Sequence, residues 1–190
     1  MRKSFCSLIS FLLFSLLACG AASAHWYVAP TGNDANNGSK RKPLKTIAAA
    51  LQRVNPGDTV FLREGSYGEF VVPTRSGKPG KMITLKSYPG EIAKIDGSDL
   101  YIKGWGNALV QVNNIDYMQF ENLHICHAHD SENNTDPEGI YITGTSGNIT
   151  FRGCKVYDIK NDCPLVDAKG DWRSAHAILV LGTDDNTPIR

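Results

Sequence analysis

Two stretches of this chain are crowded with ionisable side chains. Residues 127–138 contain two histidines and four acids: His127, His129, Asp130, Glu132, Asp136 and Glu138. Residues 158–174 mix acids with cations and one tryptophan: Asp158, Lys160, Asp162, Asp167, Lys169, Asp171, Trp172 and Arg173. Hard cations such as calcium prefer carboxylate oxygens, so Asp130, Glu132 and Asp136 are candidate calcium ligands. The alternative is that these charges only solvate two long surface loops.

The histidines offer two further kinds of chemistry. His124, His127 and His129 could ligate a transition metal, for which imidazole is a suitable ligand. Glu138 and His176 occupy equivalent positions of two successive repeats, about 4.8 Å apart if the repeats stack. A neighbouring carboxylate raises the pKa of a histidine and could poise this pair for acid or base catalysis. The alternative is an exposed structural pair.

A repeated pattern of short strands must position these side chains. Three apolar triplets recur 30 or 31 residues later: 110–112, 118–120 and 123–125 correspond to 140–142, 149–151 and 154–156. Residues 178–180 begin a third copy after a longer insertion. Alternate residues of each triplet are apolar, so one face of each strand lies inside. Because a coil of three strands cannot bury that face alone, the pattern predicts coils stacked into a solenoid.

Shorter signals organise the region before the repeat. Thr46 can cap a helix whose apolar residues have helical spacing: Ile47, Ala50, Leu51 and Val54. We expect this helix, residues 46–54, to cover the open hydrophobic end of the first coil, where unpaired strand edges are exposed. Further short strands are predicted at 59–62, 70–72, 82–86 and 93–95.

The N-terminus has the three parts of a secretory signal peptide: basic residues, an apolar run over 8–17, and small residues up to Ala24. The apolar run is too short to span a membrane, and no later segment is long enough. We therefore expect removal of residues 1–24, a secreted or periplasmic protein, and no transmembrane segment. Alternatively, residues 16–19 resemble a bacterial lipobox, which would leave a lipid anchor on Cys19 of an outer-membrane lipoprotein.

Charge and cysteine content restrict the partners. Without residues 1–24 the chain has 18 Lys and Arg against 19 Asp and Glu, so it offers no basic field for nucleic acid. Three cysteines remain, and their odd number leaves at least one unpaired in the monomer that we expect. Cys126 and Cys163 lie near loops and could pair, whereas Cys154 is expected to be a small buried hydrophobe.

The N-terminal part resembles a known superfamily. Residues 26–34 (WYVAPTGND), 42–47 (KPLKTI) and 56–60 (PGDTV) are similar to the opening of secreted right-handed parallel β-helix proteins, the pectate lyase-like and chondroitinase B-like superfamily. The resemblance covers nearly the whole mature chain. It implies an all-β, right-handed parallel β-helix, with the N-terminal strand, loop and cap helix in residues 25–57 and the coils in 58–190.

Members of this superfamily commonly bind an extended acidic polysaccharide in a groove along one sheet. The resemblance therefore implies a candidate lyase that cleaves acidic polysaccharide by β-elimination. Calcium would neutralise the substrate carboxylate, and a base would remove the adjacent proton. The candidate acids and bases are Lys160, Lys169, Arg173, His176 and Glu138. Tyr141 and Trp172 could stack on sugar rings, although packing of a loop on the sheet explains Tyr141 equally well.

No lyase motif matches residue by residue, so no catalytic role is transferred to this chain. Two other functions remain open. One is a non-catalytic glycan-binding or adhesin-like surface module, and the other is a glycoside hydrolase, which would need two carboxylates at a defined separation. The last residues, 182–190, align with the middle of a coil, so we expect a fragment of a longer protein.

Overall fold

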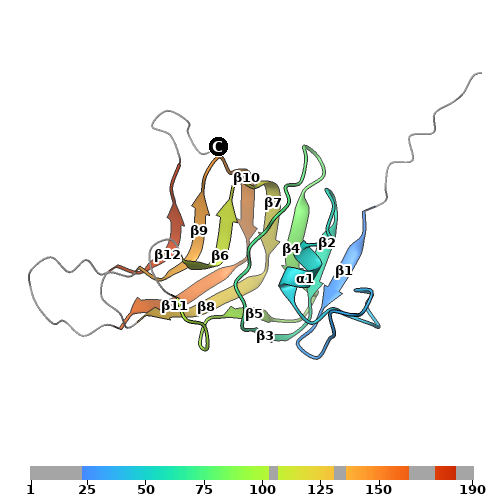
Figure 1. The fold of residues 1–190 in the computed structure, drawn as a ribbon, viewed down its shortest axis with the longest axis horizontal. Coiled ribbons are helices and arrows are strands. Elements are labelled where there is room, and N and C mark those ends of the chain that lie inside the picture. Colours follow the sequence, from blue (N-terminus) through green and yellow to red (C-terminus); the bar gives the residue numbers. More distant parts are fainter. Residues whose placement is uncertain (1–22, 103–106, 131–135, 163–173, 183–190) are drawn as a thin grey trace, which may run out of the picture.

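The computed structural model describes residues 23–102, 107–130, 136–162 and 174–182. These residues wind around one axis as a parallel β-helix, which confirms the predicted fold (Figure 1). Sheet A has the strand order β1-β2-β4-β7-β10, sheet B the order β3-β5-β8-β11, and sheet C the order β6-β9-β12. Neighbouring strands in all three sheets are parallel.

The elements are short, as expected for narrow coils. In chain order they are β1 (His25–Val28), α1 (Ile47–Leu51), β2 (Thr59–Leu62), β3 (Gly65–Tyr67), β4 (Ile83–Ser87), β5 (Ala93–Asp96), β6 (Ala108–Asn113), β7 (Asp116–Glu121), β8 (Leu123–Asp130), β9 (Glu138–Thr143), β10 (Gly147–Arg152), β11 (Lys155–Asn161) and β12 (His176–Val180). One coil therefore takes a strand from each sheet, and the sequence repeat corresponds to one coil.

Equivalent residues of successive coils are stacked in register. In sheet C, Val112 pairs with Ile142, which pairs with Val180. In sheet A, Phe120 pairs with Phe151, and their rings stack with centroids 4.5 Å apart. Phe120 is fully buried. The inward apolar residues of the repeat thus form continuous ladders along the axis.

The corner between sheets A and B is made by residues that tolerate a left-handed backbone. Asn122 joins β7 to β8 with a φ of 55°, and Gly153 joins β10 to β11 with a φ of 63°. A Cβ on Gly153 would collide with Asn122 Oδ1 of the preceding coil. Asn and Gly adopt this conformation at the least cost, so local sequence specifies these corners.

The N-terminal helix has the predicted cap and packing but is shorter than predicted. Thr46 Oγ1 accepts a hydrogen bond from the Ala49 amide at 3.1 Å. The helix ends at Leu51, before the expected limit at residue 54. Its apolar face is buried, and it packs against β1 and β2 at the N-terminal end of the stack (Figure 1).

Several local predictions need correction. Instead of a strand at 70–72, Val71 makes a single isolated bridge to Val110. The two predicted long loops are shorter than expected, because parallel pairing of β8 with β11 continues as far as Asp130 and Asn161. Residues 127–130 and 158–161 are therefore parts of strands, and their side chains stand on a sheet.

Two other sequence features have a place in this fold. Cys126 and Cys154 are free thiols, and Cys126 is fully buried. Cys163, considered above as a partner for Cys126, lies outside the described residues. Within the described ranges, no helix has both the length and the apolar character needed to cross a membrane.

Candidate functional site

Three of the predicted acids are buried where the chain passes from sheet B to sheet C. Asp130 is the last residue of β8, Glu138 is the first residue of β9, and Asp136 lies shortly before Glu138. Their exposed fractions are 6% for Asp130, 9% for Asp136 and 1% for Glu138. Buried carboxylates are uncommon unless they are paired, protonated or bound to a cation, so this turn is the first candidate for chemistry.

Glu138 is stacked between the first residues of two other sheet C strands. It is in register with Ala108 of β6 and with His176 of β12, so the predicted proximity of Glu138 and His176 is observed. The pair is not exposed as the structural alternative supposed, because Glu138 is almost completely buried. Within the described residues, Glu138 Oε2 is buried without a hydrogen-bond partner, and so is His176 Nδ1.

The surroundings of Glu138 favour its protonated form. Burial is the main cause, and the negative charge of Asp136 adds to it; together they raise the pKa of Glu138 to about 7. A carboxyl group with this pKa exchanges protons near neutral pH. That property is required of a general acid or base.

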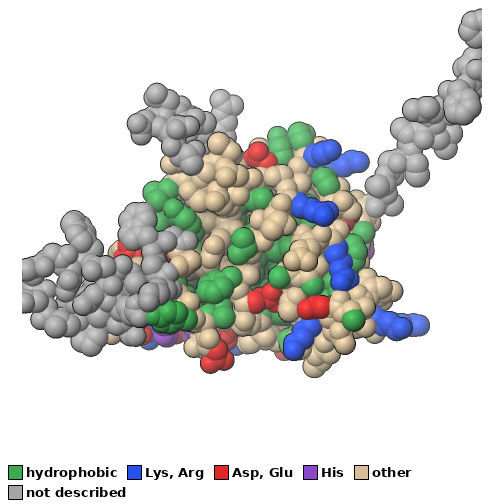
Figure 2. All heavy atoms as spheres, in the orientation of Figure 1, with side chains coloured by type: hydrophobic (Ala, Val, Ile, Leu, Met, Phe, Trp, Pro, Cys, Tyr) green, Lys and Arg blue, Asp and Glu red, His purple; other side chains and the backbone are tan. Residues whose placement is uncertain are grey.

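Asp136 has a different environment from Glu138. One of its oxygens, Oδ1, accepts hydrogen bonds from Ser174 N at 3.0 Å and from Ser174 Oγ at 2.5 Å. No Lys or Arg of the described residues forms an ion pair with Asp136 or Glu138. The Lys and Arg side chains visible in the space-filling view lie mainly over the N-terminal strands (Figure 2). Asp136 and Glu138 therefore form an acidic site without a described Lys or Arg as ion-pair partner.

The donor chemistry of this turn suits calcium. Carboxylate oxygens are the ligands that this cation prefers, and Glu138 Oε2 is a buried oxygen that lacks a described partner. Glu132, the third predicted ligand, lies outside the described residues. Among the residues that can be described, no three acids of this turn come within 4.8 Å of one another. The described part of the turn thus supplies suitable ligand types but not a complete coordination sphere.

Among the described residues, the outer face of sheet C has one Phe, Tyr or Trp side chain. Tyr141 lies between the buried residues Ile140 and Ile142 and is itself half-buried, as the alternation predicts. It is in register with Gln111 on one side and Leu179 on the other. Trp172 and Arg173, the other candidates from the second loop, lie outside the described residues. Tyr141 is therefore the described ring available for stacking on this face.

Lys160 belongs to another sheet. It lies on β11 of sheet B, in register with His129. Its Nζ atom is 3.5 Å from Asp158 Oδ1 and 4.0 Å from Asp162 Oδ1, and the side chain is 49% exposed. The structure therefore separates Lys160 from Tyr141 and Glu138, which lie on sheet C.

One group of interacting residues was only partly anticipated from the sequence. Asp96 accepts a hydrogen bond from His127 Nδ1 at 2.9 Å, across a sequence separation of 31 residues. Asp158 follows His127 by the same interval and contacts it from the other side. The coil period could have identified this alignment, because it stacks residues 96, 127 and 158 on one sheet.

Comparison with known proteins assigns the family. A family model described as Pel9A-like, right handed beta helix region, matches residues 26–184. The uncharacterized protein YwoF of Bacillus subtilis (strain 168) is 32% identical over 144 residues, which are 76% of this chain and 31% of that protein. Pectate lyase PEL9 of Emericella nidulans is 26% identical over 147 residues, which are 72% of this chain and 34% of that protein.

Solved structures agree with this assignment. The crystal structure of pectate lyase Pel9A matches with a TM-score of 0.56 and 26% identity, over 71% of this chain and 34% of that one. A lacto-N-biosidase from Eubacterium ramulus has a TM-score of 0.62 at 19% identity over 84% of this chain and 30% of that one, and it supports the fold alone. The chain spans about a third of the length of the curated relatives named above. The stacked coils and the match over residues 26–184 together place this chain in the Pel9A-like right-handed β-helix family.

Proposed function

We propose that this protein is exported and acts on acidic polysaccharide, which it binds along the outer face of sheet C and cleaves by β-elimination. Membership of the Pel9A-like family supports a polysaccharide substrate, because relatives include proteins named pectate lyases. Residues 25–190 carry 18 Lys and Arg against 19 Asp and Glu, so their net charge does not favour nucleic acid as an alternative partner. A signal peptide in residues 1–24 would deliver the protein to such a substrate.

The observation on which this proposal depends is the raised pKa of the Glu138 carboxyl group. β-Elimination removes the proton next to the uronate carboxylate, expels the glycosidic oxygen and leaves an unsaturated uronide. A group that exchanges protons near neutral pH serves either step, and Glu138 has a pKa of about 7 at the start of the middle strand of sheet C. We assign it the acid–base role, which requires the turn before β9 to expose the Glu138 carboxyl group to substrate, because this side chain is 1% exposed and lies on the inward side of β9 with Ile140 and Ile142. His176 and Arg173 are the further candidates, whereas Lys160 is engaged with two aspartates on sheet B.

Calcium fits the proposed reaction. Asp130, Glu132 and Asp136 would hold the ion, and its charge would neutralise the substrate carboxylate, which acidifies the adjacent proton. Tyr141 would bind the apolar face of a sugar ring, because aromatic faces stack on the C–H surface of sugars. The residues of this chain would thus bind, orient and exchange a proton with the substrate.

The test is an assay of the purified protein on pectate, alginate, rhamnogalacturonan and glycosaminoglycan, with calcium and with a chelator. We expect new ultraviolet absorbance from an unsaturated uronide on at least one substrate, dependent on calcium. Absence of this absorbance on every substrate, with calcium supplied, would exclude the lyase. Binding without turnover would instead indicate a glycan-binding module.

One observation favours a second reaction on the same scaffold. Glu138 is an acid with a raised pKa beside a second carboxyl group, Asp136. Glycoside hydrolases use a protonated carboxylic acid together with a second carboxylate. New reducing ends without ultraviolet absorbance would favour the hydrolase over the lyase.

Export can be tested independently of catalysis. We propose cleavage after Ala24, so that His25 becomes the first residue. N-terminal sequencing of protein recovered from the medium or periplasm checks this assignment. Recovery in the outer-membrane fraction with a lipid on Cys19 would support the lipoprotein alternative, and protein retained in the cytoplasm would contradict both.

A further inference from the structure

The outer face of sheet B holds two histidines between aspartates. His127 and His129 lie two residues apart on β8 and are both partly exposed. Asp96, the last residue of β5, flanks them on one side, and Asp158 of β11 flanks them on the other. Three strands that are distant in sequence therefore bring imidazole and carboxylate groups together on one surface.

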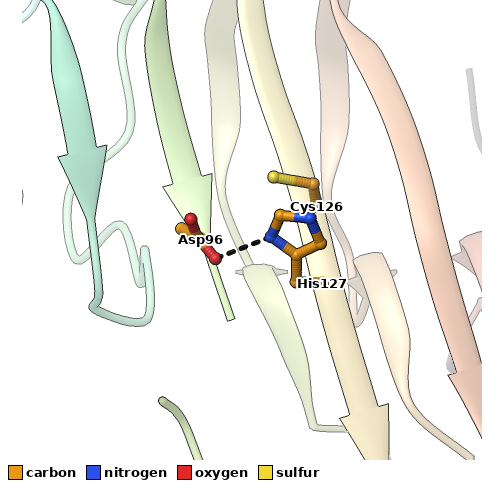
Figure 3. A group of neighbouring side chains, drawn as sticks. All are labelled: Asp96, Cys126 and His127. Carbon is orange, nitrogen blue, oxygen red and sulfur yellow. Dashed lines mark hydrogen bonds and ion pairs between the residues drawn. The ribbon is translucent and has the colours of Figure 1, made fainter. Parts of the chain in front are cut away.

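His127 is held between two carboxylates. Its Nδ1 atom lies 2.9 Å from Asp96 Oδ1, a contact drawn in Figure 3. The same atom lies 3.1 Å from Ser98 Oγ. Its Nε2 atom lies 3.6 Å from Asp158 Oδ2. The hydrogen bond to Asp96 leaves Nε2 directed toward Asp158 as the nitrogen available for a ligand.

His129 approaches the same oxygen from a second direction. Its Nε2 atom lies 3.3 Å from Asp158 Oδ2, and its Nδ1 atom lies 3.6 Å from Asp162 Oδ2. Although the side chain is partly exposed, Nε2 itself is shielded from solvent and has no hydrogen-bond partner among the described residues. The Nε2 atoms of both histidines therefore lie within 3.6 Å of one carboxylate oxygen.

The backbone explains this convergence. His127 and Asp158 both have positive φ angles, 60° and 55°, which are uncommon for residues other than glycine. Strand pairing includes Cys126 with Tyr157 and Ala128 with Ile159, and does not include the two residues between them. Both strands thus deviate from regular strand geometry at equivalent positions, His127 on β8 and Asp158 on β11. Such irregularities redirect a side chain, and here they bring His127 and Asp158 together.

We propose that His127, His129 and Asp158 bind a divalent transition-metal ion of the zinc class on the outer face of sheet B. Two imidazole nitrogens and one carboxylate oxygen are a suitable ligand set for such ions, with water completing the coordination. The three ligand atoms do not all lie within 4.8 Å of one another, so binding would draw the two imidazole rings together as well as shift the Asp158 carboxylate. The site lies on a different sheet from Glu138 and Tyr141 and is independent of the proposed polysaccharide reaction.

The neighbouring acids have supporting roles. Metal-bound histidines usually donate their other ring N–H to a carboxylate, which fixes the orientation of the ring. Asp96 occupies that position for His127, and Asp162 lies on the corresponding side of His129. Both are therefore positioning residues. Lys160 contacts the other oxygen of Asp158, Oδ1, so it leaves Oδ2 facing the histidines.

A different ligand set is available nearby but is less suitable. Potential ligand atoms of Asp96, Cys126 and His127 lie within 4.8 Å of one another (Figure 3). Metal binding requires the thiolate, whereas burial raises the pKa of the fully buried Cys126 thiol. This set also uses His127 Nδ1, which already bonds to Asp96. The set of His127, His129 and Asp158 requires neither deprotonation of a buried thiol nor loss of the hydrogen bond between His127 and Asp96.

The test is calorimetric titration of chelator-treated protein with Zn²⁺, alongside visible absorption after addition of Co²⁺. We expect saturable binding of a single ion and a Co²⁺ spectrum that Zn²⁺ abolishes. His129→Ala and Asp158→Asn should each weaken Zn²⁺ binding at least tenfold, and Asp96→Asn should weaken it by about 10- to 100-fold. His129→Gln is a second variant that retains more of the side-chain volume if the alanine variant unfolds.

Two matched controls identify the ligands. His124→Ala removes another half-buried histidine of β8 and should leave Zn²⁺ affinity unchanged. Cys126→Ser should also leave it unchanged. The proposal is overturned if the wild-type protein does not bind Zn²⁺ saturably, if His129→Ala and Asp158→Asn bind normally, or if Cys126→Ser abolishes binding. Polysaccharide turnover in the chelator-treated protein with calcium restored tests the proposed function separately.

Discussion

The turn between β8 and β9 and the outer face of sheet B both bring acids close to histidines, but they shift the pKa of an acid in opposite directions. Glu138 in the turn is buried with a second acid as its neighbour, and its pKa is raised to about 7. Burial also acts on Asp96 of sheet B, but hydrogen bonds from Ser98 and His127 outweigh it and lower the pKa to about 2. Residue type alone therefore does not determine which acid exchanges protons near neutral pH.

The same contrast applies to the chemistry that each place supports. In the turn, Asp136 and Glu138 form no ion pair with a described Lys or Arg, which favours proton exchange or a hard cation. On sheet B, carboxylates orient imidazoles, which favours a transition metal. Five experiments can break or sharpen this comparison.

The largest expected effect is on turnover by Glu138→Gln. If Glu138 is the acid–base group, its loss should lower kcat on the cleaved polysaccharide by about 100-fold or more. Asp162→Asn, which changes an exposed acid directly after β11 of sheet B, is the matched control and should retain activity. Equal activity of the two variants would remove Glu138 from the reaction.

The second experiment measures how Glu138 affects stability as pH rises. The pKa of about 7 in the folded state lies above the ordinary value of 4.5, so folding favours the protonated form. Stability should therefore fall as pH increases from about 4.5 through 7, by at most about 3 kcal/mol. Urea unfolding at stepped pH, with chelator present, should detect this loss in the wild type and a smaller loss in Glu138→Gln. Identical pH profiles would contradict the raised pKa.

Asp96 should have the opposite pH dependence. Its pKa of about 2 in the folded state lies below the ordinary value of 3.8, so its stabilising contribution is complete above pH 4 and is lost as pH falls through 2. The contribution amounts to about 2 kcal/mol. Asp96→Asn should abolish this dependence in chelator-treated protein. An acid-unfolding profile that is unaltered by the substitution would show that Asp96 has no such partners in solution.

The fourth experiment asks which face binds sugar. Tyr141→Ala on sheet C should weaken polysaccharide binding about fivefold, because ring contacts contribute about 1 kcal/mol. Tyr157→Ala is the matched control, since Tyr157 is a partly exposed ring on sheet B. Affinity electrophoresis in polysaccharide gels compares the two. A larger loss in Tyr157→Ala would place the binding face on sheet B.

The smallest effect is expected from Lys160→Ala. Exposed ion pairs such as those to Asp158 and Asp162 contribute little to stability, so thermal unfolding should change little. Turnover should also be retained, because Lys160 lies on sheet B. A complete loss of turnover in a folded Lys160→Ala variant would instead establish the lysine as the base predicted from the sequence.

The fold was largely predictable because its signals are local and repeated. Apolar alternation places Val112, Ile142 and Val180 in one inward ladder, and the structure confirms this register. Left-handed corners at Asn122 and Gly153 use residue types suited to that conformation. The strand ends were less accurate, since the extension of β8 to Asp130 depends on pairing with β11.

The candidate sites could be predicted only in part. Stacking of Glu138 on His176 follows from counting along the repeat, and the structure has this register. Burial of Glu138 does not follow from counting, because it depends on several chain segments at once. Lys160 shares a sequence stretch with Trp172 and Arg173, yet its side chain engages Asp158 and Asp162 on sheet B.

The sequence by itself determined the coil period, the inward ladders and the residue types available to each sheet, because these depend on side-chain alternation and turn chemistry along the chain. Only the tertiary structure decided how those residues behave. It buried Glu138 near Asp136, and it gave His127 and Asp158 the unusual backbone angles that bring them together. Desolvation and contacts between distant coils set these properties, and both depend on positions in space that no local pattern encodes.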